Sequence, residues 1–216
     1  MTADLFADAA PEPRTEPIVD GAVVLRAFAL ADDASLLTAI NAVITQAPLR
    51  RMQTPGGLPM SVAITNCGSL GWVSDERGYR YAAHDPVSGQ HWPAMPAVFL
   101  QLAQRAATAT GFVDFVPDAC LINRYEVGAR MSLHQDKNEG DFSQPIVSVS
   151  LGLPAVFQFG GLVRGDRTLR VPLAHGDVVV WGGDARLRFH GVLPLKTGSH
   201  AVLGAQRINL TFRKAG

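Results

Sequence analysis

The sequence predicts a mainly β protein with flanking helices, an α+β chain whose core is a sandwich or a jelly roll. From Ala119 onward the chain is divided into short β-branched segments, about eight strands, separated by Gly, Pro and Asp turns. Before Ala119, two segments show the apolar spacing of amphipathic helices. A chain of 216 residues most simply forms one structural domain with a substantial core.

Composition excludes several classes of protein. Hydrophobic residues make up 47% and charged residues 18% of the chain, and no apolar run approaches the roughly 18 residues of a membrane span. The N-terminus has neither the basic nor the apolar region of a signal peptide. The two cysteines form no C-x-x-C motif and suit a reducing compartment. We therefore expect a cytoplasmic, monomeric protein that does not contact membranes.

The first part of the chain is predicted to hold a tail, a strand and two helices. Residues 1–17, rich in Ala, Pro and acids, indicate a flexible tail, and residues 22–30 indicate a short strand. A helix follows, capped near Asp32 and stopped at Pro48. A second helix is expected over residues 93–110, with a glycine directly after it as the stop signal.

Residues 49–92, between these two helices, have a different character. They are rich in Gly, Pro, Ser and Tyr, carry two tryptophans, and show no sustained periodicity. An irregular segment of this length in a globular domain is usually functional or mobile. The later strands are expected over 119–126, 146–152, 155–161, 169–173, 177–183, 188–195 and 207–213.

A histidine and an aspartate two residues apart suggest a metal site. On an extended strand, His134 and Asp136 project to the same face, and His190 at the end of a later strand is available as a third ligand. Two histidines and one carboxylate form the facial triad of non-haem iron enzymes. A second pair, His175 and Asp177, has the same spacing, but the glycine between them is typical of a turn that opens a strand. We favour the first pair, and the alternative is that it too is only turn chemistry.

The last strand carries a polar face whose residues indicate an anion-binding site. In "RINLTFR" the side chains of Arg207, Asn209, Thr211 and Arg213 share one face, and the apolar ones share the other. Burying arginine is costly unless an anion meets it, and guanidinium groups bind carboxylates bidentately. The "LINRY" segment repeats the pattern with Asn123 and Tyr125 on one face. The alternative is that both arginines point outward and pair with surface acids.

Several stretches together resemble the AlkB family of iron(II)- and 2-oxoglutarate-dependent dioxygenases. They are "PDACLINRY", "SLHQDK", "SVSLGLPAVFQFGG", "HGDVVVWGG" and "RINLTFR", with "DLFADA" near the start and "TPGG…MSVAITNCG" in the irregular segment. The likeness covers nearly the whole chain. It implies a double-stranded β-helix, or jelly roll, as the dioxygenase core over 119–216. Residues 18–118 would supply the helices and a nucleotide-recognition lid, the lid itself being about 49–92.

The resemblance also implies ligands for the metal and for the cosubstrate. His134, Asp136 and His190 would bind Fe(2+), with molecular oxygen as the oxidant. The residues implied to hold 2-oxoglutarate are Asn123, Tyr125, Arg207, Asn209 and Arg213. On this basis we expect Arg213, helped by Tyr125, to bind the carboxylate far from the metal, and Arg207 with Asn209 to support the end near the iron.

Substrate residues are implied in the same way. Trp72 would stack on the base, with the His134 ring on its other face, and Tyr79 and Arg164 would hold the flanking backbone or base edge. Close relatives carry an acid where this chain has Asn138, so an amide there alters the preference for a cationic methylated base. The remaining residues placed at the substrate are Arg80 and Tyr81.

The expected activity is oxidative dealkylation of nucleobases such as 1-methyladenine and 3-methylcytosine in alkylated DNA, with RNA left open. A base alkylated on its pairing edge must be single-stranded or flipped out of a duplex. One alternative is the same chemistry on a small molecule or a protein side chain. Another is a non-catalytic jelly-roll binding module in which His134 and Asp136 are surface residues.

Overall fold

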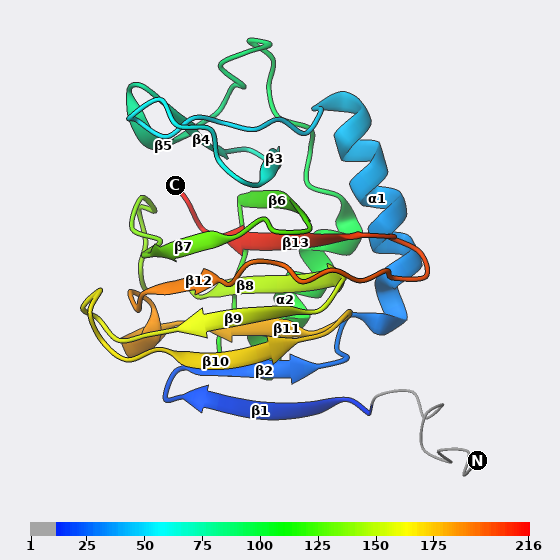
Figure 1. Ribbon diagram of the computed structural model, residues 1–216, viewed down its shortest axis with the longest axis vertical. Coiled ribbons are helices and arrows are strands. Elements are labelled where there is room, and N and C mark those ends of the chain that lie inside the picture. The colour runs from blue at the N-terminus through cyan, green and yellow to red at the C-terminus, as the bar shows by residue number, and fades with distance from the viewer. Residues whose placement is uncertain (1–11) are drawn as a thin grey trace.

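The middle layer of the molecule is a seven-stranded antiparallel sheet with the strand order β1-β2-β11-β8-β13-β6-β3 (Figure 1). The computed structural model describes residues 12–216. The strands of this sheet are β1 (Arg14–Val19), β2 (Ala22–Arg26), β3 (Ala63–Gly68), β6 (Ala119–Glu126), β8 (Ile146–Gly152), β11 (Val178–Trp181) and β13 (Gln206–Arg213).

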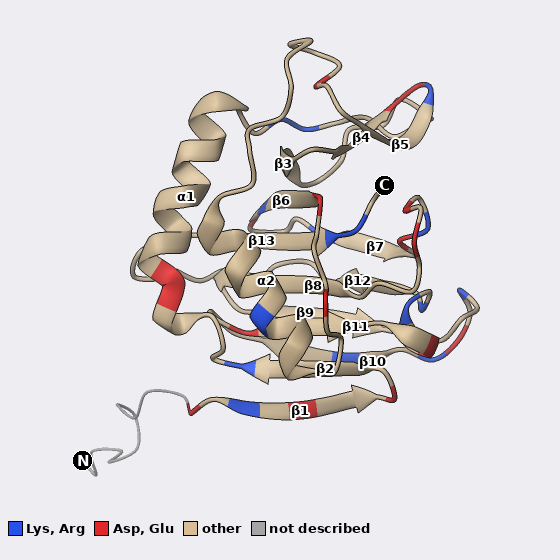
Figure 2. Cartoon of the chain, turned by 180° about the vertical axis from the view of Figure 1, so that it is seen from behind, with Lys and Arg blue, Asp and Glu red and all other residues tan. Residues whose placement is uncertain are grey.

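A smaller, four-stranded sheet covers one face of this layer. Its strands, in the order β10-β9-β12-β7, are β10 (Leu169–Leu173), β9 (Ala155–Phe159), β12 (His190–Val192) and β7 (Met131–His134). The helices α1 (Asp33–Gln46) and α2 (Ala97–Ala109) lie on the opposite face of the large sheet, as the view from behind shows (Figure 2). Two short 3-10 helices, η1 (Leu30–Asp32) and η2 (Gly183–Ala185), complete the elements. The two facing sheets form the jelly roll that the strand pattern predicts.

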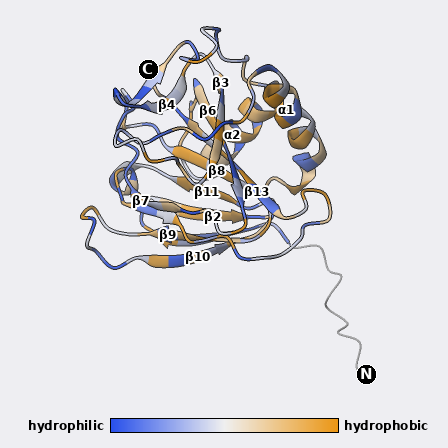
Figure 3. Cartoon of the chain, turned by 45° about the horizontal axis from the view of Figure 1, so that its top comes forward, coloured by the Kyte–Doolittle hydropathy of each residue, from blue (hydrophilic) through white to orange (hydrophobic). Residues whose placement is uncertain are grey.

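Successive side chains of the central strands point to opposite faces of the large sheet, and both faces are covered. On β13, Ile208, Leu210 and Phe212 pack with α1 and α2 in one apolar cluster. The residues between them face the small sheet, so β13 is buried along nearly its whole length. Hydrophobic colour gathers on central strands such as β8, while the outer loops are hydrophilic (Figure 3). The polar face of β13 is therefore inside the molecule, and the alternative of outward-pointing arginines is wrong.

The irregular segment predicted over 49–92 contains more regular structure than expected. Strand β3 belongs to the large sheet, where it pairs with β6 from Ala63 to Gly68. Strands β4 (Gly71–Asp75) and β5 (Gly78–Ala82) form a separate two-stranded hairpin. The periodicity of β3 is hidden because nearly all of its side chains are buried, on both faces.

Several predicted boundaries were wrong, among them the strand expected over 22–30, which ends at Arg26. Residues 14–17 were assigned to a flexible tail, but they form the start of β1, which is an edge strand that pairs with β2. The second helix starts at Ala97 rather than Pro93, because Pro96 disfavours helical backbone in the residue before it. Residues 1–11 of the predicted tail, which include "DLFADA", lie outside the described residues. No helix within residues 12–216 is long and apolar enough to cross a membrane.

Candidate active site

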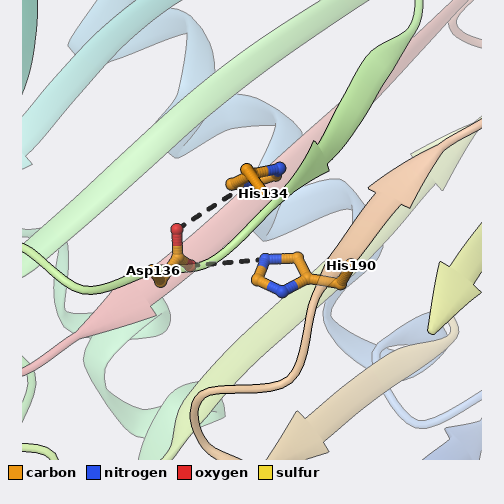
Figure 4. A group of neighbouring side chains, drawn as sticks. All are labelled: His134, Asp136 and His190. Carbon is orange, nitrogen blue, oxygen red and sulfur yellow. Dashed lines mark ion pairs between the residues drawn. The ribbon is translucent and has the colours of Figure 1, made fainter. Parts of the chain in front are cut away.

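His134, Asp136 and His190 come together where β7 (Met131–His134) pairs with β12 (His190–Val192) in the small sheet (Figure 4). His134 ends β7 and His190 begins β12, and the register of these strands places the two histidines directly opposite each other. Asp136 lies two residues beyond the end of β7. Its two carboxylate oxygens are 3.7 Å from His134 Nε2 and 3.6 Å from His190 Nε2. One ligand atom from each of the three residues lies within 4.8 Å of the others, a spacing suited to one metal ion.

Backbone carbonyls hold both imidazoles in the orientation that a metal requires. His134 Nδ1 lies 2.9 Å from the carbonyl oxygen of Ser132, and His190 Nδ1 lies 3.0 Å from that of Arg188. Because a carbonyl can only accept a hydrogen bond, each Nδ1 carries the proton and each Nε2 keeps its lone pair. Both lone pairs are directed toward Asp136, so the donor set is preorganised.

The surroundings keep the ligands in their metal-binding protonation states. Burial, followed by the nearby His190, lowers the pKa of His134 to about 4, so its imidazole is neutral at pH 7. Burial by itself would raise the pKa of Asp136, but Arg213 and the two histidines hold it well below its usual value. The His134 side chain is 37% exposed, whereas the His190 side chain is only 5% exposed. The site therefore opens to solvent on the His134 side.

Arg213 contacts the metal-facing carboxylate, whereas we expected it at the carboxylate of 2-oxoglutarate far from the metal. Its Nη2 and Nε donate to Asp136 Oδ2 at 2.6 and 2.9 Å. These bonds orient the carboxylate and leave Asp136 Oδ1 on the side of His134. Spacing along β13 could not distinguish the two arginines, because they share one face of the strand.

Arg207, at the other end of the same face, is a buried cation without an anion. It is 1% exposed, its Nε donates to Ser150 Oγ at 2.9 Å, and its guanidinium lies 4.9 Å from the centre of the Tyr125 ring. Its Nη1 has no hydrogen-bond partner, and no carboxylate of residues 12–216 pairs with it. Burial lowers the pKa of Arg207, which means that an anion beside it would be strongly favoured.

The two asparagines of the predicted anion site differ in whether a side-chain polar atom remains without a hydrogen-bond partner. Asn123 Oδ1 is buried without a hydrogen-bond partner, on the same side of the sheet as Arg207. Asn209 instead donates to Ser148 Oγ and to the Val149 carbonyl, both at 2.8 Å, and accepts from Thr211 at 2.9 Å. Its amide is already used to join β13 and β8, so Asn209 supports the site and Asn123 has the free group.

The second His-x-Asp pair is occupied by structural hydrogen bonds, as the sequence indicated. Asp177 accepts bonds from the Ala27 and Ala174 backbone nitrogens at 3.0 and 2.9 Å and from Arg26 Nη1 at 2.7 Å. His175 Nδ1 accepts the Gly152 N–H at 2.9 Å. Neither residue belongs to the cluster that could hold a metal, within the part of the chain that the structure describes.

The hairpin residues predicted to contact substrate have different surroundings. The rings of Trp72 and Tyr79 stack on each other, with centroids 5.5 Å apart and an interplanar angle of 14°. Arg80 is paired with Asp75 within the hairpin through two bonds of 2.8 Å. The Tyr81 hydroxyl donates to Glu139 Oε1 at 2.7 Å. Of these side chains, the stacked Trp72–Tyr79 pair is the one left to meet a ligand.

Two further predicted residues lie on loops around the metal ligands. Arg164 donates to the Leu133 carbonyl at 2.6 Å and lies 4.9 Å from the centre of the Phe189 ring. It therefore touches the neighbours of both metal-facing histidines. Asn138 is exposed, two residues after Asp136.

Sequence reasoning missed Glu139 and Arg186. Glu139 is buried behind Asp136, and Arg186 donates to the Asp136 carbonyl at 2.9 Å. Glu139 lies in the hydrophilic stretch "KNEG", where a surface position is the simpler expectation. Arg186 lies in a turn whose sequence indicates no particular role. The only hint at either residue in the sequence is that each is a charged residue close to a metal ligand.

Comparisons with known proteins agree with this geometry. The model of the 2OG-Fe(II) oxygenase superfamily matches residues 21–213. The chain is 60% identical to the "Alpha-ketoglutarate-dependent dioxygenase AlkB" of Escherichia coli (strain K12), over 99% of this chain and 98% of that protein. It is 34% identical to the "Nucleic acid dioxygenase ALKBH1" of Mus musculus, over 57% of this chain and 31% of that one. A solved structure, "The structure of OsALKBH1", superposes with a TM-score of 0.81 at 28% identity, covering 93% of this chain and 100% of that one.

Proposed function

Because this chain belongs to the 2OG-Fe(II) oxygenase superfamily, and within it to the AlkB family, we propose that it oxidatively dealkylates nucleobases in nucleic acids. Iron and 2-oxoglutarate held by these residues would supply the oxidation: with O2, the cosubstrate would be converted to succinate and CO2, and the N-alkyl carbon would be oxidised and lost as an aldehyde. The observation that carries this proposal is the His134, Asp136 and His190 cluster together with an unpaired buried arginine, Arg207, on the face of β13 that also carries Arg213. The binding-module alternative does not fit, because Asp136 is 11% exposed and is not a surface residue.

The three metal-facing side chains would hold the iron from one side. Two neutral imidazoles and one carboxylate are the facial ligand set of non-haem iron oxygenases, which leaves the remaining positions for oxygen and a cosubstrate. Asp136 remains charged because Arg213 donates to it. The role of Arg213 is then to orient the metal-ligating carboxylate rather than to bind the far end of the cosubstrate.

Arg207, with Tyr125 and Asn123, would hold the far carboxylate of 2-oxoglutarate. A carboxylate satisfies the free Nη1 of Arg207 and neutralises a cation that is otherwise alone in the interior. Substitution of Arg207 by alanine should raise the apparent KM for 2-oxoglutarate by about 100-fold, since a buried charge pair is worth several kcal/mol. Metal affinity measured without cosubstrate should stay within about twofold. Equal loss of both affinities would place Arg207 at the metal instead.

The β4–β5 hairpin would present the substrate to the metal. Base–aromatic stacking contributes roughly 1–3 kcal/mol per base, and the Trp72–Tyr79 pair offers such a surface. Arg164, which donates to the Leu133 carbonyl next to His134, would supply a cation for the flanking backbone. A base alkylated on its pairing edge reaches this position from a single strand or as a flipped nucleotide. Asn138, which offers an amide in place of a carboxylate, would reduce selectivity for cationic bases.

We also propose how the chain is organised and where in the cell it acts. The helices and hairpin of residues 18–118 would form the substrate-binding half, packed on a 119–216 core, in a monomer. Cys67 and Cys120 are cross-strand partners, and both are free and buried. Two adjacent free thiols are typical of a reducing compartment, which supports the cytoplasm as the site of action.

The decisive experiment measures succinate and formaldehyde together. The iron-loaded protein is incubated with 2-oxoglutarate and with oligonucleotides that contain 1-methyladenine or 3-methylcytosine, as DNA and as RNA, single-stranded and duplex. Equal release of both products with methylated strands, and background release with unmethylated ones, is the expected result. A Trp72→Ala variant should need more oligonucleotide while keeping its substrate-independent turnover of 2-oxoglutarate. Turnover with free small molecules or peptides, and none with nucleic acid, would contradict the proposal.

A further inference from the structure

Glu139 is a buried carboxylate that the proposed chemistry does not use. It is 7% exposed, and three groups from different parts of the chain surround it. Tyr81 donates to its Oε1 at 2.7 Å, and Arg213 Nε lies 3.5 Å from the same oxygen. Arg186 Nη2 is 3.2 Å from Oε2, an ion pair without hydrogen-bond geometry. Two acids, Asp136 and Glu139, thus face two arginines in one enclosed, electrically balanced group.

These contacts form a continuous path from the hairpin to the metal site. Tyr81 is on β5, and its hydroxyl meets Glu139 in the loop after β7. Arg213 links Glu139 to Asp136, because it contacts both carboxylates. Arg186 donates to the Asp136 and Gln144 carbonyls at 2.9 and 3.1 Å, which fixes both ends of that loop. In both views of the whole chain, the hairpin and this loop lie on the same side of the molecule (Figures 1 and 2).

Two side-chain hydrogen bonds hold β5 from outside the hairpin, one from Tyr81 to Glu139 and one from Trp92 Nε1 to the Ala82 carbonyl at 2.9 Å. The hairpin is separate from both sheets, and a two-stranded hairpin is marginally stable without support. Strand β4 has its own anchors, since Asn66 bonds the Trp72 backbone at both of its polar groups and Ser74 donates to the Gln53 carbonyl. Within residues 12–216, Tyr81–Glu139 is the side-chain hydrogen bond that joins β5 to the loop carrying Asp136.

We propose that Tyr81 and Glu139 form a latch that holds the β4–β5 hairpin over the site and couples its closure to the order of the Asp136 carboxylate. Tyr81 is then a positioning residue, and its expected role as a substrate contact is replaced. Binding of metal to Asp136 restrains Arg213, which restrains Glu139 and so favours the latched hairpin. Because such coupling is reciprocal, a closed hairpin also favours the bound metal. This inference deepens the proposed function by naming what positions the substrate-binding hairpin.

The test compares amide hydrogen exchange of residues 71–82 in the full-length protein, metal-free and with Mn(II), without nucleic acid or cosubstrate. In the wild type, Mn(II) should slow exchange of these amides by about fivefold. In Tyr81→Phe, which removes one hydroxyl and keeps the ring, the hairpin should exchange about fivefold faster with Mn(II) bound, and the metal effect should disappear. Tyr79→Phe, which removes a hydroxyl from the same strand, is the matched control and should exchange as the wild type does.

Two results would overturn the latch. One is a hairpin in Tyr81→Phe that still slows on metal addition as the wild type does. The other is faster exchange of the whole chain to the same extent with and without Mn(II), since that makes Tyr81 an ordinary packing residue. A second readout is the affinity for Mn(II), which should fall about threefold in Tyr81→Phe and not in Tyr79→Phe. Neither measurement uses nucleic acid, so absence of turnover on oligonucleotides would disprove the proposed function and leave the latch to be decided separately.

Discussion

Two segments of this chain carry the same pattern, His134-Gln135-Asp136 and His175-Gly176-Asp177, at the ends of different strands. In the first, two histidine Nε2 atoms and a carboxylate converge on one point. In the second, both Asp177 oxygens accept hydrogen bonds from Arg26 and from backbone nitrogens, and His175 Nδ1 accepts the Gly152 N–H. The two motifs contain the same residue types. They differ in whether the nitrogen and oxygen lone pairs face one another or accept structural hydrogen bonds.

This difference follows from the neighbouring strands. His134 is paired in register with His190, so a second imidazole is supplied from directly opposite. Asp177 instead lies where β11 begins beside β2, and it closes a turn next to the backbone of Ala27. A His-x-Asp pair therefore forms a metal site when its partner strand supplies another ligand. It forms a structural hydrogen-bonded turn when the neighbouring chain supplies N–H donors.

The largest expected difference between the two pairs is in metal affinity. Substitution of His134 by alanine removes a ligand and should weaken Fe(II) binding by at least about 1000-fold, whereas His175→Ala should change it by less than about twofold. Anaerobic titration with Fe(II) measures both variants. Comparable losses in the two variants would mean that the geometric distinction between the pairs has no chemical consequence.

The second effect is a loss of stability, without a loss of metal affinity, when Asp177 is replaced. Asp177→Ala leaves Arg26 and two backbone N–H groups without their buried acceptor, which should lower the free energy of unfolding by about 3 kcal/mol. Metal affinity should be retained. Urea unfolding of the metal-free protein gives the first quantity and Fe(II) titration the second. A variant as stable as the wild type would show that the hydrogen bonds accepted by Asp177 do not stabilise the fold.

The middle residues of the two patterns should also differ. Gly176 has φ +84°, and a Cβ there would lie 2.5 Å from a Leu30 side-chain carbon, so Gly176→Ala should cost about 2 kcal/mol. Gln135→Ala loses one bond to the Leu187 carbonyl, at 2.6 Å, and should cost about 1 kcal/mol. Thermal unfolding of both variants checks the order. A larger loss at Gln135 would contradict the assignment of strain to the glycine turn.

The smallest expected effect is a pH dependence to which each region contributes one histidine. Burial and a neighbouring histidine lower the pKa of His134 to about 4 and lower that of His200, which packs against His175. An unfolded histidine titrates near 6.5. Between pH 6.5 and about 4 the unfolded chain therefore binds protons that the folded chain does not, and the metal-free protein loses stability as pH falls.

Substitution of His134 by glutamine should make this pH slope shallower without abolishing it, because His200 remains. Urea unfolding at a series of pH values from 7.5 to 4.5, on wild type and variant, measures both slopes. An unchanged slope in the variant would show that His134 does not contribute to it.

Much of the fold was predictable because it depends on local pattern. The β13 segment alternates polar and apolar residues with period two, which determines that Arg207 and Arg213 share a face whatever the strand packs against. The helix over α1 follows from apolar spacing and from Pro48 as its stop. The metal ligands His134 and Asp136 were recognisable for the same reason, since two residues of spacing bring them to one side.

Tertiary structure alone decided what each of those residues touches. Arg213 pairs with Ala119 in register and reaches Asp136, while Arg207 pairs with Tyr125 at the other end, and this order depends on how β6 and the ligand loop sit beside β13. Strand β3 joined the large sheet through β6, which is more than fifty positions later in the chain. Tyr81 met Glu139 for the same reason. Periodicity along one segment determines the face on which a side chain lies, but the register between segments distant in sequence determines its partner, and only folding sets that register.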